Sequence, residues 1–121
     1  MATKKAGIEV WGIPTCGTTR KAVKFLESKG IALEYKNLRE TAVPKVLIRE
    51  MLKSVVEVRR VFNTSGGSYK DGDWKNRIAD MNHEQIIEAL TADPMLIKRP
   101  VVRTPKGLVV GFDEQAISDL L

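Results

Sequence analysis

Two adjoining segments near the N-terminus indicate the fold class of the chain: Gly7-Ile8-Glu9-Val10-Trp11-Gly12-Ile13 and Pro14-Thr15-Cys16-Gly17. The first segment alternates apolar with small or polar side chains, which predicts a strand, and the second is typical of a turn. Thr18 to Lys29 then places apolar residues at helical spacing, and Gly30 is a typical helix stop. Residues 32–38 alternate again. The first forty residues therefore predict a strand–helix–strand unit with parallel strands.

The remaining chain predicts helices first and then a hairpin. A helix is expected over 41–53, with Pro44 near its start, and the capping-box pattern Ser54-Val55-Val56-Glu57 predicts a second, short one to about Phe62. Residues 63–73 predict a flexible, irregular loop. A third helix is expected after Asn82, then a strand pair over 101–103 and 108–112, and a last helix capped by Asp113. The order predicts one α/β domain over residues 1–121, a mixed sheet flanked by helices with a helical insertion over about 41–92.

Composition limits the classes of function. The chain has 121 residues, a net charge of +5 and 43% hydrophobic residues, an ordinary globular mixture. It contains no long basic run and few aromatic residues, so we expect no direct binding to nucleic acid. No segment is apolar enough to span a membrane, and residues 1–13 make a poor signal peptide, so we expect a cytoplasmic protein.

Cys16 is the only cysteine and His83 the only histidine. An intramolecular disulfide is excluded, and a zinc cluster cannot be built on this pair, so we expect no bound metal or cofactor. Cys16 is predicted at a helix N-terminus, where unpaired amides and the helix dipole lower a thiol pKa below its usual value of about 8.5. The amides of Gly17, Thr18 and Thr19 could hold an oxyanion.

Two arginines complete the predicted site. Arg20 adds a positive charge one turn after Cys16, and Arg99 precedes Pro100 at the start of a strand. Arg99 is either a surface charge or an anion clamp, and the Arg99–Pro100 bond is a candidate cis peptide. A buried, purely structural Cys16 is the competing interpretation.

Three motifs resemble the arsenate reductase and Spx-type family. They are, in order, Pro14-Thr15-Cys16-Gly17-Thr18-Thr19-Arg20, Phe62-Asn63-Thr64-Ser65-Gly66 with Tyr69, and Lys98-Arg99-Pro100-Val101-Val102. The resemblance covers nearly the whole chain and implies a thioredoxin-like, glutaredoxin-like fold with Pro100 as the cis-proline element beside the cysteine. It implies a Cys16 nucleophile that attacks arsenate, with glutathione and glutaredoxin as external reductants and a small oxyanion or glutathione as ligand.

The chain departs from the arsenate-reducing pattern at two arginine positions. These fall at about Val61 and Gly111, and Arg103 is a candidate substitute for part of the missing charge. Phe62-Asn63-Thr64-Ser65-Gly66 and Val110-Gly111-Phe112 are nearer the Spx-like branch, which implies the RNA polymerase α subunit as a partner. Thr19 occupies the second position of that branch's Cys-x-x-Cys pair, so a Cys16–Thr19 disulfide switch is excluded. Three hypotheses remain: a monothiol oxidoreductase, a polymerase-binding regulator and a scaffold that has lost its chemistry.

Overall fold

The computed structural model describes residues 7–121, whose contacts divide them into two compact units. The first unit joins residues 7–41 to 99–121, and the second comprises residues 42–98. Residues 1–6, which entered the signal-peptide argument, lie outside the described part. Within that part, none of the helices has the length and apolar character needed to cross a bilayer.

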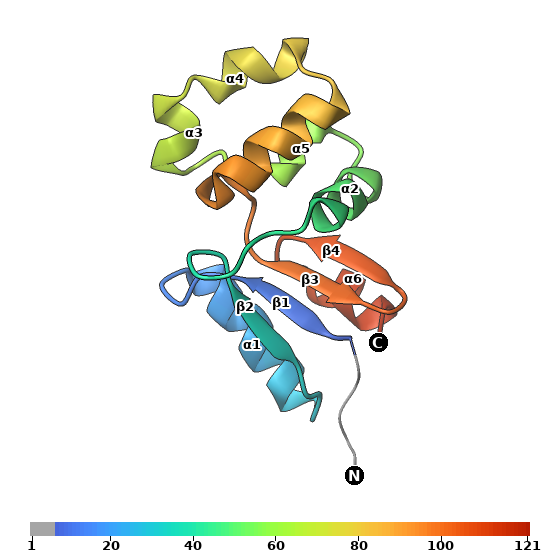
Figure 1. The fold of residues 1–121 in the computed structure, drawn as a ribbon. Coiled ribbons are helices and arrows are strands. Elements are labelled where there is room, and N and C mark those ends of the chain that lie inside the picture. Colours follow the sequence, from blue (N-terminus) through green and yellow to red (C-terminus); the bar gives the residue numbers. More distant parts are fainter. Residues whose placement is uncertain (1–6) are drawn as a thin grey trace. The chain divides into compact units, whose positions relative to one another are not determined.

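The first unit is a four-stranded mixed sheet in the order β2-β1-β3-β4 (Figure 1). The predicted strand–helix–strand unit is confirmed, because β1 and β2 are parallel and α1 connects them. The predicted hairpin is confirmed too: β3 pairs antiparallel with both β1 and β4. The elements are β1 (Glu9–Gly12), α1 (Gly17–Ser28), β2 (Glu34–Asn37), β3 (Val101–Thr104), β4 (Gly107–Val110) and α6 (Glu114–Asp119).

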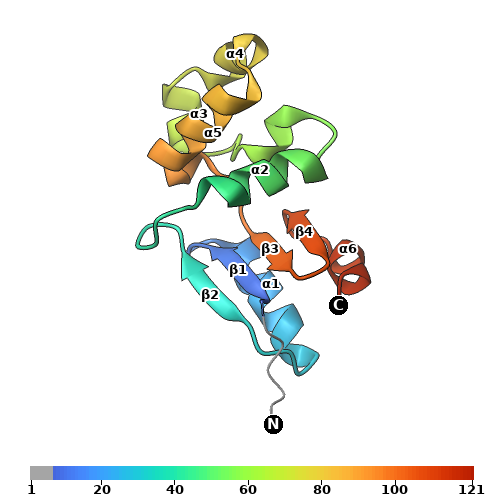
Figure 2. The same ribbon diagram turned by 45° about the vertical axis from the view of Figure 1, so that its right-hand side comes forward.

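One face of this sheet forms the core of the unit. Because side chains alternate along a strand, Val10 of β1 and Val102 of β3 point to the same face. There they pack with Leu26 of α1 and Ile117 of α6, all fully buried. Both helices therefore lie on one side of the strands, as the turned view in Figure 2 also shows. The opposite face carries Trp11 and charged residues.

The second unit is helical. Its principal pair is α2 with α5, which bury apolar side chains at helical spacing such as Leu47 and Met51 of α2 and Ile86 and Leu90 of α5. Helical structure continues to Leu96, beyond the expected boundary near 92. The elements are α2 (Lys45–Ser54), η1 (Val58–Val61), α3 (Gly67–Asp71), α4 (Trp74–Arg77), η2 (Ile78–Asp80), α5 (His83–Ala92) and η3 (Pro94–Leu96).

Two predicted helix starts in this unit are wrong. The helix expected from 41 begins at Lys45, because the residue before Pro44 is disfavoured in helical geometry and Pro44 itself is extended. Ser54 does not cap a new helix. It ends α2, and its hydroxyl donates to the carbonyl of Met51 at 2.8 Å, so the next helical turn begins only at Val58.

The irregular loop expected over 63–73 is also wrong in part, because it contains α3 and runs into α4. Ring packing explains these short helices: Tyr69 and Trp74 each lie 6.0 Å from Phe62, centroid to centroid. The caps farther along are confirmed. Asn82 and Gln85 form a reciprocal capping box, and the Asp113 side chain accepts from the amide of Ala116.

Candidate active site

The turn after β1 carries Cys16 to the N-terminal end of α1. The Cys16 amide donates to the carbonyl of Ile13, and its own carbonyl accepts from the amide of Arg20, both at 3.1 Å. Cys16 is therefore the N-cap of a twelve-residue helix whose first turn contains no acidic side chain. The positive end of the helix dipole faces the thiol without a carboxylate to offset it.

The thiol of Cys16 is poised as a thiolate. Partial burial raises its pKa, but the hydroxyls and amides of Thr18 and Thr19, which all favour the thiolate, outweigh this effect and lower the pKa from 9.0 to about 6. The Thr18 hydroxyl lies 3.1 Å from Sγ and must be the donor once the thiol has ionised. About nine-tenths of the thiol is then ionised at pH 7.

Thr19 supplies a buried polar group beside the cysteine. Its side chain is 1% exposed and packs against Gly12, where an added Cβ would collide with it. The Thr19 hydroxyl is near enough to the thiolate to lower the pKa of Cys16. It forms no direct hydrogen bond within the described residues. The hydroxyl is directed at Gly12 and not at solvent, so Thr19 packs the first turn of α1 against the end of β1 beside the cysteine.

Arg20 and the Arg99–Pro100 peptide both lie near the Gly12 end of β1, where this turn begins. The exposed Arg20 guanidinium donates to the carbonyl of Pro14 at 2.9 Å, which folds it back across the turn. The Arg99–Pro100 peptide is cis, as predicted. Pro100 directly precedes β3, and Val101 of β3 pairs with Trp11 near the end of β1. The cis peptide therefore lies at the end of β1 that leads to Cys16.

The structure does not bring Arg103 to the thiol. Arg103 pairs with Glu9 at the beginning of β1, the end of the strand away from Cys16. The two side chains form an ion pair at 3.8 Å on the face opposite α1. The two positions where the arsenate-reducing pattern has arginine hold no cation: Val61 is fully buried in the second unit, and Gly111 has a φ of 89°.

Sequence reasoning missed Tyr35 and the groove beside it. Burial raises the pKa of the Tyr35 phenol, and the negative charges of Cys16 and Glu40 raise it further, so the phenol lies within electrostatic reach of the thiolate. The alternation over 32–38 could have shown that Leu33 and Tyr35 share a face, but not that α1 lies opposite them.

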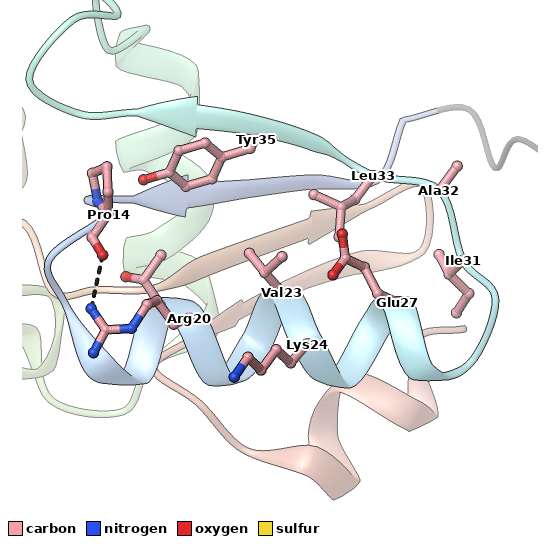
Figure 3. A pocket seen from close by; sticks show the side chains of 10 residues that line it. Pro14, Arg20, Val23, Lys24, Glu27, Ile31, Ala32, Leu33 and Tyr35 are labelled. Atoms are coloured by element: carbon pink, nitrogen blue, oxygen red, sulfur yellow. Dashed lines mark hydrogen bonds between the residues drawn. The ribbon is translucent and has the colours of Figure 1, made fainter.

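The groove between α1 and β2 has a volume of about 680 Å³ (Figure 3). Pro14, Arg20 and Tyr35 lie at one end, and Ile31 and Ala32 at the other. We call it the α1–β2 groove; its lining residues are Pro14, Thr19, Arg20, Val23, Lys24, Glu27, Ile31, Ala32, Leu33 and Tyr35. Within residues 7–121, no group of three or more His, Cys, Asp or Glu side chains is placed to hold a metal ion.

The sheet topology, the cis-proline and the helix-capping cysteine define a thioredoxin-like protein with a single cysteine at the N-terminus of α1. More narrowly, the chain belongs to the ArsC family, whose model matches residues 11–120. It is 34% identical over 107 residues to an uncharacterized protein, YusI, of Bacillus subtilis, covering 88% of this chain and 91% of that one. It is 25% identical to the global transcriptional regulator Spx of Lactiplantibacillus plantarum (89% and 81% covered). It is 24% identical to an arsenate reductase of Escherichia coli (96% and 82% covered).

Solved structures support the same fold. A possible arsenate reductase from Streptococcus mutans UA159 superposes with a TM-score of 0.80 at 28% identity, covering 87% of this chain and 90% of that one. The arsenate reductase from Vibrio cholerae gives a TM-score of 0.81 at 21% identity, covering 94% and 97%. The predicted family and fold class are therefore confirmed.

Proposed function

We propose that the protein is a monothiol oxidoreductase of arsenate-reductase type, with Cys16 as its nucleophile. The observation that carries this proposal is the Cys16 thiol at the N-terminus of α1, with a pKa lowered to about 6 by the threonines of that turn. Such a thiol is a nucleophile at neutral pH. A merely structural cysteine would have no need of these donors.

The N–H groups of Gly17, Thr18 and Thr19 would hold the negative oxygens of a substrate, as helix N-termini do. Arg20 and Arg99 would add positive charge. Pro100 would position the substrate beside the thiol. With arsenate, the Cys16 thiolate would bond to arsenic, and an oxygen would leave as water after protonation.

One external thiol would complete the reduction. Its sulfur would attack the Cys16 sulfur of the arsenic adduct, arsenic would keep the electron pair of the S–As bond, and arsenite would leave as As(III). Cys16 would remain in a mixed disulfide with glutathione, which glutaredoxin and a second glutathione would reduce. The chain holds no second cysteine, so every later electron comes from outside.

The missing arginines favour a broader substrate than arsenate. A hydrogen bond to a charged group contributes about 1.5–3 kcal/mol, so the absence of two arginine contacts would weaken arsenate binding by several kcal/mol. A mixed disulfide, which needs less positive charge than arsenate, is the other substrate class that we propose for Cys16.

The test incubates the purified protein with arsenate, glutathione and glutaredoxin, and in parallel with a glutathione mixed disulfide. We expect turnover of one substrate by the wild type and none by Cys16→Ser. The pKa of Cys16, measured from the pH dependence of iodoacetamide alkylation, should lie near 6. A thiol that titrates near 8.5 and turns over neither substrate would overturn the proposal.

A second candidate is an Spx-like regulator that binds the RNA polymerase α subunit. The Phe62-Asn63-Thr64-Ser65-Gly66 motif and the sequence similarity to Spx proteins favour it. Because Thr19 cannot form a disulfide with Cys16, such binding would not depend on an internal redox switch. A pull-down should then retain the α subunit equally with wild type and Cys16→Ser, and absence of binding in both would exclude this candidate.

A further inference from the structure

The α1–β2 groove adjoins the reactive thiol. Cys16 lies in the chain between Pro14 and Arg20, which line one end of the groove together with Tyr35 (Figure 3). Thr19, whose hydroxyl is buried without a partner, lines the groove and also lowers the pKa of Cys16. One residue, Thr19, thus belongs both to the lining of the groove and to the surroundings of the thiol.

The lining of the groove is that of a small-molecule site. Val23, Ile31 and Leu33 give it an apolar wall on both the helix and the strand sides. Its volume of about 680 Å³ lies within the usual range for ligand sites, and such sites combine an apolar lining with a few placed polar groups. Two cations and one carboxylate line the groove: Arg20 lies at the Pro14 end, Lys24 lies beside Val23, and Glu27 lies toward the Ile31 end (Figure 3).

We propose that the α1–β2 groove binds the organic body of the substrate, a low-mass disulfide with an apolar group and an acidic group. This inference rests on the proposed function, because it specifies the substrate class of Cys16. The apolar group would lie against Val23 and Leu33, and the acidic group would pair with Arg20 or Lys24. An inorganic oxyanion would leave these contacts unused.

The chemical step is a thiol–disulfide exchange. The Cys16 thiolate attacks the sulfur attached to the apolar group, a Cys16–S–S–R bond forms, and the other half of the disulfide leaves as a thiolate with the electron pair of the broken S–S bond. An external low-mass thiolate then attacks the R-bearing sulfur. This second exchange returns the Cys16 thiolate and carries the organic group away as a new mixed disulfide.

Alkyl methanethiosulfonates test the groove, because their reactive group is constant while the alkyl group changes. Each transfers its RS group to Cys16 and releases methanesulfinate, and the single cysteine ensures that one site is measured. Rate constants for the methyl, propyl, pentyl and benzyl reagents are divided by those for a small reference thiol. We expect the ratio to rise about two- to fourfold for each methylene that enters the groove.

Reagents of opposite charge provide a second test, which can be made on the wild-type protein. The anionic 2-sulfonatoethyl reagent should react faster than the cationic 2-(trimethylammonio)ethyl reagent, again relative to the reference thiol, and added salt should reduce the difference. Lys24→Gln should also reduce it. Equal ratios for the two reagents at low salt would overturn the acidic part of the proposal.

Two groove variants separate binding from reactivity. Val23→Gln removes an apolar side chain from the helix wall, and Leu33→Gln does so from the strand wall. Either should flatten the dependence on alkyl length, so that the longer reagents lose their advantage over the methyl reagent. Lys21→Gln is the matched control, because Lys21 is an exposed α1 residue that does not line the groove.

If the relative rate constant in the wild type does not change with alkyl length, while the methyl reagent reacts fast, the groove proposal is overturned and the proposed function is left intact. A slow methyl reaction together with a Cys16 pKa near 8.5 would instead overturn the proposed function. The relative rate constant could also rise with alkyl length equally in the wild type and in a folded Val23→Gln or Leu33→Gln variant. The apolar contact would then lie elsewhere, and this groove would be refuted as the site.

Discussion

Replacing Thr18 with valine should raise the pKa of the Cys16 thiol by about one unit. The substitution keeps the shape of the side chain but removes the hydroxyl that lies 3.1 Å from Sγ. A hydrogen bond to a charged group contributes about 1.5–3 kcal/mol, and this exposed one should fall at the lower end. Because one pKa unit corresponds to about 1.4 kcal/mol, the pKa should rise from about 6 to about 7.

The assay is the rate of iodoacetamide alkylation from pH 5 to pH 9. At pH 6 the ionised fraction should fall from about one half in the wild type to about one tenth in Thr18→Val. Above pH 8.5 both thiols are ionised and the two rates should converge. Thr18→Ser is the matched control, because it keeps the hydroxyl and should titrate like the wild type.

The Thr18 hydroxyl is thus expected to hold the pKa of Cys16 low. A Thr18→Val protein that is folded and still titrates near 6 would refute this role. That result would assign the stabilisation of the thiolate to the Thr19 hydroxyl, the helix amides and the helix dipole.

Three further predictions concern stability, each measured by urea denaturation. The thiol pKa is lower in the folded state than in the unfolded chain, so the stability gained from Cys16 is present above pH 9 and lost as pH falls toward 6. The difference in the free energy of unfolding between wild type and Cys16→Ser should therefore grow by up to about 1.4 kcal/mol per pH unit as the pH rises from 6 to 9. A difference that stays constant with pH would contradict the assigned pKa. Gly12→Ala should destabilise the protein by about 1–3 kcal/mol, because the new methyl group meets the Thr19 side chain, and Thr19→Ala should restore part of the loss; additive effects would refute the collision. Asn82→Ala should cost about 1 kcal/mol by removing the cap of α5, whereas Asn82→Asp should cost little; equal losses would argue against capping.

Local patterns predicted those parts of the fold that local interactions determine. The alternation of residues 7–13 gave a strand, and the spacing of Ala22 and Leu26 gave the buried face of α1. The capping box at Asn82 was visible because its two partners are three residues apart. The position of Cys16 at a helix N-terminus followed from the same kind of signal.

The errors occur where tertiary contacts decide the structure. The Ser54-Val55-Val56-Glu57 pattern suits a helix start, but a serine hydroxyl can equally donate to a carbonyl in the preceding turn, and Ser54 does so. α3 and α4 lack strong helix signals and follow two glycines. They depend on rings that meet only in the folded unit. The role of Tyr35 was hidden for the same reason, because nothing in its neighbourhood in the sequence shows that it faces α1.

The sheet register also has a consequence for the order of assembly. β1 pairs with β2 across a short connection, but its other neighbour, β3, lies about 90 residues farther along the chain. Contacts this distant in sequence form slowly compared with local ones. Arg99 and Pro100 therefore reach the neighbourhood of Cys16 only when β3 joins β1, which is also the step that supplies Val102 to the core. The thiol and its helix are made early in the chain, but the complete site forms only with this late strand.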